Sequence, residues 1–145
     1  GAFFRRKIYF MAKKELFTGA LGFVYKRVEA IPVNRDGNDS YSLKLALTAL
    51  KNERALGIFP EGTRIANRDG NPQFKPGVGM LAIKTRTPII PIYIEGNYRI
   101  WGKVNAVVGR PYELSEYYDK KLTSEDYEAI ANGIIAKSVI DLKSN

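Results

Sequence analysis

The feature that most limits the fold of this chain is the alternation of short strand-like runs with segments of helical periodicity. A strand is typically a short run rich in aromatic and β-branched residues, whereas a helix repeats its apolar positions three and four residues apart. The runs that predict strands are Ile8–Ala12, Ala30–Val33, Ala55–Phe59, Pro88–Ile94 and Val104–Val108. This alternation predicts an α/β domain with a mixed, largely parallel sheet flanked by helices.

Helical segments lie between these runs. An apolar stripe follows the polar residues 38–40 and predicts the clearest helix. The stripe consists of Leu43, Ala46, Leu47 and Leu50. Residues 77–85 predict another helix, and the Thr-x-x-Asp capping box at 123–126 predicts the start of a helix that closes the domain. Shorter helical stretches are expected through Leu16–Phe17 and Phe23–Val28.

Two of the predicted strands carry cues to their place in the sheet. Pro32 has no N–H to donate, so Ala30–Val33 is expected at an edge or an end of the sheet. Ala55–Phe59 is a continuous apolar run, typical of a strand covered on both faces, so a central position is expected. The glycine- and proline-rich segment 60–76 follows that strand, where α/β domains place their binding sites.

The length of 145 residues suits one domain, and neither a repeat nor a linker divides it. The opening residues, Gly1–Phe4, are typical of a domain interior, which predicts a single domain, 1–145, truncated at its N-terminus. The longest uncharged run, Leu16–Tyr25, is far shorter than the roughly 20 apolar residues that cross a bilayer. The sequence has no cysteine, which favours a reducing compartment.

The net charge of +8 predicts attraction to a polyanion. Nucleic acid, an anionic membrane surface and a phosphorylated metabolite all fit this charge, as does a basic surface that is simply solvated. Charge alone does not choose among them.

The segment Phe59–Arg64 carries the most specific combination of chemical groups. Gly62 allows a ligand to approach the backbone closely, Thr63 can donate to an anion, and Arg64 presents a planar fork that suits two phosphate oxygens. Glu61 can accept from a hydroxyl group or orient the arginine. Taken alone, the pattern also fits an ordinary turn with a surface ion pair.

This hexapeptide resembles the hallmark of the glycerophospholipid acyltransferase family, and three other blocks occur in the family's order. Residues 12–17 are similar to the stretch before the second motif. Ala30–Arg35 resembles that motif, with asparagine where aspartate is common. Phe74–Gly77 together with Pro88–Ile92 is similar to the segment that leads to the fourth motif. The resemblance runs from Ile8 to Gly96 and is closest to bacterial enzymes that acylate lysophosphatidate.

The resemblance implies transfer of a fatty acyl group to a glycerophosphate hydroxyl group from a thioester of acyl carrier protein or coenzyme A. It implies no metal and no cofactor besides that co-substrate. Arg35 and Arg64 are the implied phosphate ligands, with Lys13 as a further ligand and Lys75 as a weaker candidate. Glu61, Gly62 and Thr63 complete the implied acceptor site. Taken one at a time, each basic residue is more typical of a solvated surface than of a phosphate ligand.

One part of the family pattern is absent from the sequence. The family's catalytic base is the histidine of a His-x4-Asp motif, and these 145 residues contain no histidine. A carboxylate such as Glu61 or Asp36 would need a strongly raised pKa to replace it. The chain as written is therefore expected to be inactive, either because the segment before Gly1 is omitted, which the intact phosphate-binding residues favour, or because the protein is a natural non-catalytic relative.

Contact with a membrane is expected because the acceptor and the product are lipids. The apolar residues of 17–25, flanked by Lys13, Lys14, Lys26 and Arg27, fit an anionic interface or an acyl groove, and equally a helix packed in the core. The resemblance implies a location on the cytoplasmic face of the cell membrane, peripheral or anchored by an N-terminal segment.

Three other functions remain open. The first is a non-catalytic module that binds anionic lipid or phosphate, and the second is a glycerol-3-phosphate acyltransferase of the same family. A nucleic-acid binder is the weakest alternative, because the basic residues are scattered and no motif for nucleic acid is present. No nucleic-acid partner is therefore predicted.

Overall fold

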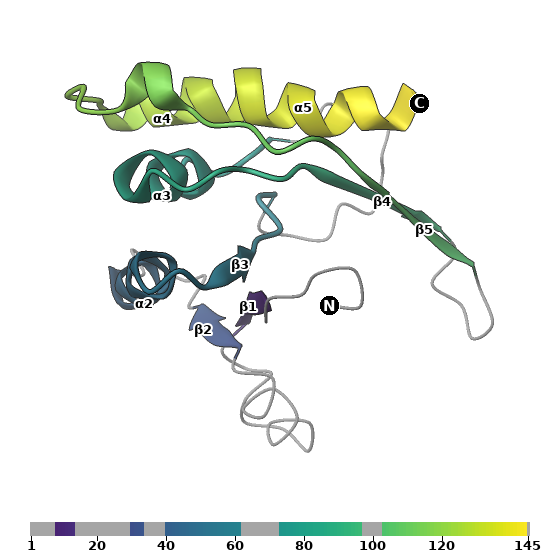
Figure 1. The fold of residues 1–145 in the computed structure, drawn as a ribbon, viewed down its shortest axis with the longest axis horizontal. Coiled ribbons are helices and arrows are strands. Elements are labelled where there is room, and N and C mark those ends of the chain that lie inside the picture. Colours follow the sequence, from purple (N-terminus) through teal and green to yellow (C-terminus); the bar gives the residue numbers. More distant parts are fainter. Residues whose placement is uncertain (1–7, 14–29, 34–39, 62–72, 97–102, 145) are drawn as a thin grey trace. The chain divides into compact units, whose positions relative to one another are not determined.

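The computed structural model describes residues 8–13, 30–33, 40–61, 73–96 and 103–144 (Figure 1). The chain forms two compact units, residues 1–59 and 60–145.

The first unit contains a small parallel sheet. Its strands are β1 (Ile8–Lys13), β2 (Ile31–Val33) and β3 (Ala55–Gly57), in the order β2-β1-β3. Helix α2 (Ser40–Lys51) connects β2 to β3 and contacts both strands. A strand, a crossover helix and a parallel strand are the basic unit of an α/β fold.

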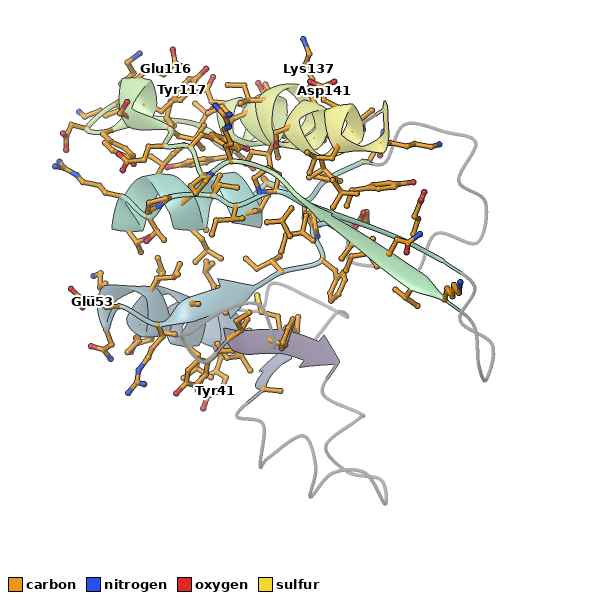
Figure 2. All side chains as sticks on the ribbon, turned by 45° about the vertical axis from the view of Figure 1, so that its right-hand side comes forward. Tyr41, Glu53, Glu116, Tyr117, Lys137 and Asp141 are labelled. Carbon is orange, nitrogen blue, oxygen red and sulfur yellow. The ribbon has the colours of Figure 1, made fainter. Side chains whose placement is uncertain are left out.

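Helix α2 lies where the apolar stripe predicts it. Ala46 is completely buried, and Leu43, Leu47 and Leu50 are half-buried on the same stripe. Ser42 is buried as well, although it is polar and lies outside the predicted stripe. Tyr41 is exposed and points away from the helix (Figure 2).

The predicted edge strand is confirmed, but the predicted central strand is wrong for the described sheet. β2 lies at one edge, as Pro32 indicates, and the centre is occupied by β1 rather than β3. The side chains of β3 are only half-buried, and Phe59 beyond it is 64% exposed. An apolar run predicts a strand covered on both faces, but both the cover and the neighbours of β3 are set by long-range contacts that the run does not encode.

The second unit contains a helix, an antiparallel hairpin and a long C-terminal helix. Helix α3 spans Gly77–Thr85. The hairpin consists of β4 (Ile92–Gly96) and β5 (Val104–Val108), and a short 3₁₀ turn, η2, follows at Ser115–Tyr117. The C-terminal helix runs through α4 (Ser124–Ile130), a π turn η3 (Ala131–Ile135), α5 (Ala136–Ile140) and a 3₁₀ turn η4 (Asp141–Ser144).

The start of the hairpin differs from the prediction. A buried strand was expected over Pro88–Ile94, but β4 begins at Ile92 and its last two residues are exposed. Ile89 instead forms an isolated bridge in which Ile89 and Tyr112 exchange backbone hydrogen bonds of 2.8 and 3.0 Å. Pro88 and Pro91 lack N–H groups, which explains why a regular ladder does not extend through this stretch.

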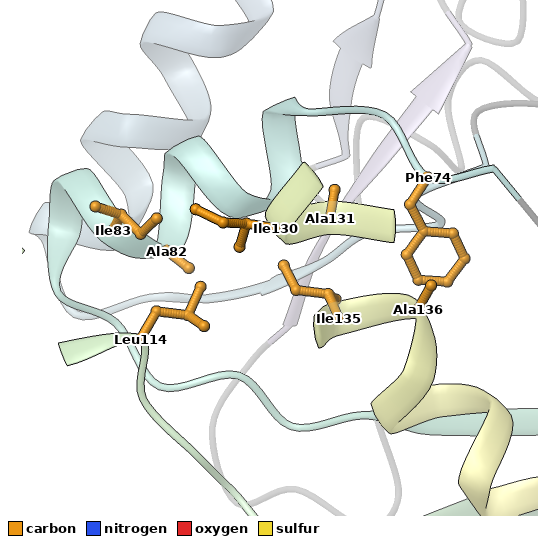
Figure 3. Packing of buried hydrophobic residues seen from close by; sticks show 8 residues of the cluster. All are labelled: Phe74, Ala82, Ile83, Leu114, Ile130, Ala131, Ile135 and Ala136. Atoms are coloured by element: carbon orange, nitrogen blue, oxygen red, sulfur yellow. The ribbon is translucent and has the colours of Figure 1, made fainter. Parts of the chain in front are cut away.

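The core of the second unit lies between α3 and the C-terminal helix (Figure 3). Its buried members are Phe74, Ala82, Ile83, Leu114, Ile130, Ala131, Ile135 and Ala136. The first half of the C-terminal helix contacts α3, and its second half contacts β4 and β5. Lys137 and Asp141 lie on its opposite, exposed side (Figure 2).

The C-terminal helix begins with the predicted capping box. The Thr123 hydroxyl oxygen accepts a hydrogen bond from the Asp126 backbone N–H at 3.2 Å. The Asp126 carboxylate in turn accepts from the Thr123 backbone N–H at 2.8 Å. Two backbone donors that a helix start otherwise leaves unpaired are thereby satisfied.

The prediction of a mixed α/β fold is confirmed, with small sheets and flanking helices in the described residues. The short helices expected through Leu16–Phe17 and Phe23–Val28 lie outside the described residues, and the single domain stays a prediction. No helix in the described ranges is long and apolar enough to cross a membrane.

Candidate functional site

The parallel sheet brings the carboxyl ends of its strands to the same end of the sheet. In the register of β1 with β2, the last residue of β1, Lys13, pairs with the last residue of β2, Val33. Arg35 follows Val33 by two positions, outside the described residues. The sheet therefore places the backbone of Lys13 beside the strand that leads to Arg35, although the structure does not describe either side chain.

β3 runs in the same direction, with Phe10 paired to Gly57, so its carboxyl end lies at the same end of the sheet. The chain then continues through Phe59 and Pro60 to Glu61, which is half-buried. Gly62, Thr63 and Arg64 lie outside the described residues. Their grouping with Arg35 stays a prediction.

One backbone hydrogen bond joins the start of the Pro60–Arg64 segment to Lys75. The Lys75 N–H donates to the Pro60 carbonyl oxygen at 2.8 Å. The side chain of Lys75 is exposed. The structure thus places Lys75 beside the residue that precedes Glu61, whereas sequence spacing placed it only somewhere in the loop.

A side chain that the sequence analysis missed holds the neighbouring residue, Phe74. The Asn132 Oδ1 atom accepts from the Phe74 backbone N–H at 2.8 Å. The Asn132 Nδ2 group donates to the Phe74 carbonyl oxygen at 3.2 Å and to the Glu128 carbonyl oxygen at 3.0 Å. The only sequence signal was an asparagine inside a predicted helix, where this residue type is unfavourable.

Among the described residues, the groups with a shifted pKa lie in the scaffold. Burial raises the pKa of the Tyr112 phenol, and its 3.0 Å hydrogen bond to Ser138 opposes that rise. The backbone and side-chain hydrogen bonds from Thr123 lower the pKa of Asp126. Burial also raises the pKa of the Tyr118 phenol, and none of these three groups lies in segment 60–75.

A metal site was not predicted. Within the described ranges, no group of three or more histidine, cysteine, aspartate or glutamate residues is suitably placed to hold a metal ion. The expectation of metal-free chemistry stays a prediction.

Comparison with protein families assigns the chain to a class. A family model described as Acyltransferase matches residues 1–95, which carry all four sequence blocks. The chain therefore belongs to the acyltransferase family, and the resemblance inferred from those blocks is confirmed.

Individual relatives have a more specific name. The chain is 30% identical over 136 residues to the 1-acyl-sn-glycerol-3-phosphate acyltransferase of Streptococcus pneumoniae, a match that covers 89% of this chain and 49% of the relative. It is 30% identical over 117 residues to the protein of that name from Bacillus subtilis, covering 77% of this chain and 57% of the relative. A match to the Borreliella burgdorferi protein of that name reaches 46% identity over 93 residues, covering 54% of this chain and 36% of the relative.

These matches also show how much of each relative's length the chain covers. The chain spans about half the length of the first two relatives, at 49% and 57%. No solved structure matches the chain at a significant level.

Proposed function

We propose that the whole protein transfers a fatty acyl group from a thioester to the free hydroxyl group of lysophosphatidate, giving phosphatidate for phospholipid synthesis. The observation that carries the proposal is the match of residues 1–95 to the acyltransferase family. Relatives named 1-acyl-sn-glycerol-3-phosphate acyltransferase support this particular acceptor.

The acceptor's phosphate is proposed to bind to Arg35 and Arg64, with Lys13 and Lys75 as further ligands. The parallel register of β1, β2 and β3 supports this assignment, because Lys13 ends one of three strands that run in one direction, and Arg35 and segment 61–64 follow the other two. Arginine is suited to a phosphate because its planar fork can donate to two oxygens at once.

The acceptor hydroxyl group is proposed to lie near Glu61, Gly62 and Thr63. A glycine in this position allows the glycerol backbone to approach the main chain, and the hydroxyl and amide groups of Thr63 can donate to an anion. The half-buried Glu61 supports a role inside the site rather than on the open surface.

The reaction needs a base, which the proposal places in a His-x4-Asp segment outside these 145 residues. The histidine takes the proton of the acceptor hydroxyl group, and the resulting oxygen nucleophile attacks the thioester carbonyl carbon. A C–O bond forms, the C–S bond breaks, and the thiol leaves with the proton that the histidine returns. The leaving thiol belongs to coenzyme A or to acyl carrier protein, and no other cofactor takes part.

The site is proposed to work at the cytoplasmic face of the cell membrane, as a peripheral or anchored enzyme. Both the acceptor and the product are lipids, and the net charge of +8 favours an anionic surface. The segment 17–25, proposed to contact that surface, lies outside the described residues.

An acyl-transfer assay with the whole protein tests the proposal. Lysophosphatidate and glycerol 3-phosphate are offered as acceptors, each with acyl-coenzyme A and with acyl-acyl carrier protein. Phosphatidate formed from lysophosphatidate is the expected product. Product from glycerol 3-phosphate alone would indicate the other acceptor class, and binding of lysophosphatidate without turnover would indicate a non-catalytic binding module.

A further inference from the structure

We propose that Asn132, on the C-terminal helix, is a positioning residue for the acceptor site. Its side-chain amide fixes the backbone of Phe74, which in turn fixes Lys75 against Pro60. The proposal rests on the function proposed above. The family match ends at residue 95, so the family pattern does not include Asn132.

The Asn132 amide uses both of its polar atoms on this task. Its oxygen accepts from the Phe74 N–H at 2.8 Å, and its nitrogen donates to the Phe74 carbonyl oxygen at 3.2 Å. The second N–H of the amide is directed to the Glu128 carbonyl oxygen at 3.0 Å, one turn earlier in the same helix. The amide is therefore held by its own helix and holds Phe74 as a neighbouring strand would.

The side chain of Phe74 is buried in the core and so also holds the backbone at this residue in place. Phe74 is 3% exposed, and its ring lies beside Ala136 of the C-terminal helix (Figure 3). A residue this deeply buried needs partners for its backbone N–H and carbonyl groups, because an unpaired buried polar group is costly. Asn132 supplies both partners from a position 58 residues away in the sequence.

The constraint passes from Phe74 to its neighbour without an intervening side chain. Lys75 is covalently joined to Phe74, and the Lys75 N–H donates to the Pro60 carbonyl oxygen at 2.8 Å. The start of the Pro60–Arg64 segment and the return of the chain at Lys75 are thus tied together at the point that Asn132 holds. Movement of Phe74 would move the Lys75 ammonium group away from the position proposed for the phosphate.

The local helix geometry supports a specialised role for this position. Asn132 lies in the π turn Ala131–Ile135, and π turns are rare and occur frequently at functional sites. The residue itself is not part of the buried core, so its truncation should leave core packing intact.

Steady-state kinetics of the whole protein test the proposal, with lysophosphatidate as acceptor. Asn132→Ala, Lys75→Ala and the double variant are compared with the wild type. Ser138→Ala is the matched control, because the Ser138 hydroxyl hydrogen-bonds Tyr112 and the Ile135 carbonyl oxygen on the same helix but does not touch Phe74.

The two single variants are expected to raise the acceptor KM by roughly tenfold each, with little change in the KM of the acyl donor. If Asn132 acts through Lys75, adding Asn132→Ala to Lys75→Ala raises the acceptor KM by less than about twofold more. Ser138→Ala is expected to leave the acceptor KM unchanged.

An unchanged acceptor KM in Asn132→Ala would overturn the proposal, and so would two effects that multiply fully in the double variant. If Asn132→Ala does not fold, Asn132→Asp keeps an acceptor for the Phe74 N–H but loses the donor to the Phe74 and Glu128 carbonyl oxygens and places a negative charge beside them. The acceptor KM is expected to rise in that variant too, and an unchanged value overturns the proposal equally. Absence of lysophosphatidate acylation by the wild type would overturn the proposed function itself, and this inference with it.

Discussion

At the scale of single residues, the candidate site is proposed to depend on a few backbone hydrogen bonds as well as on its cations. The Lys75 N–H donor to Pro60 and the Asn132 amide on Phe74 fix the backbone at Lys75, a residue proposed to bind phosphate, and at the residue immediately before it. An exposed lysine loses conformational entropy when it binds a ligand. Fixing its backbone beforehand reduces part of that cost.

Asp126 predicts how stability depends on acid pH. The hydrogen bonds from Thr123 lower its pKa in the folded state below the ordinary value of 3.8, so the unfolded state binds more protons in that range. The contribution of Asp126 is therefore present above the unfolded pKa and is lost as the pH falls through the lowered folded pKa. Urea unfolding from pH 2 to 6 measures this, with Asp126→Asn expected to flatten the acid side of the profile. An identical pH profile in both proteins would contradict the prediction.

Two glycines predict opposite responses to alanine. Gly96 has a φ of 153°, and a Cβ atom there would lie 2.7 Å from the Val104 Cα atom and against the Lys103 carbonyl oxygen. Because those obstacles are backbone atoms, Gly96→Ala is expected to destabilise the protein by about 1–3 kcal/mol. Gly133 is helical with no neighbour within 4 Å of such an atom, so Gly133→Ala is expected to stabilise by about 0.5–1 kcal/mol. Denaturant midpoints decide, and equal shifts for the two variants would refute the account.

At the scale of elements, the C-terminal helix is the main support of the second unit. Its buried face contacts α3 along its first half and the hairpin along its second. The helices were predictable because their apolar spacing and capping box are local signals, and α3 and the start of α4 lie where those signals predict them. The start of β4 was predicted too early, because the apolar stretch around Pro88 and Pro91 has the composition of a strand. The two prolines prevent a regular ladder there, and β4 begins at Ile92.

A substitution at Ile135 tests how much the buried face of this helix contributes to stability. It is 2% exposed within the core cluster, so Ile135→Ala is expected to lower the free energy of unfolding by about 2–5 kcal/mol. Lys137→Ala, on the exposed face of the same helix, is expected to change it by less than about 0.5 kcal/mol. Chemical denaturation of both variants provides the measurement, and a small effect at Ile135 would show that the core packing is described incorrectly.

At the scale of the whole molecule, the family of the protein was predictable from the sequence, whereas the arrangement of its candidate site was only partly predictable. Order and spacing of the four blocks predicted the family, because motif residues at strand exits are a local feature of the sequence. The position of Lys75 beside Pro60 was not predictable, because a backbone hydrogen bond across a loop leaves no pattern in residue type. Asn132 was missed for a related reason, since its partner is 58 residues away and outside the family match.

The overall charge fits the proposed acceptor without identifying it. A net charge of +8 attracts any polyanion, whereas the proposed pairing of Arg35 with Arg64 would distinguish a phosphate-bearing lipid from the same lipid without phosphate. The phosphate group is therefore the chemical feature on which the central claim depends.

The most direct test compares lysophosphatidate with monoacylglycerol, which has the same acyl chain and no phosphate, as acceptors for the wild type and for Arg64→Ala of the whole protein. The account predicts that the wild type strongly prefers lysophosphatidate. Arg64→Ala should lower kcat/KM for that acceptor by roughly 10- to 100-fold, because a charged hydrogen bond to phosphate is lost, and should leave the low rate with monoacylglycerol unchanged. Equal loss with both acceptors, or no loss with either, would contradict a phosphate-binding role for this residue and with it the proposed site.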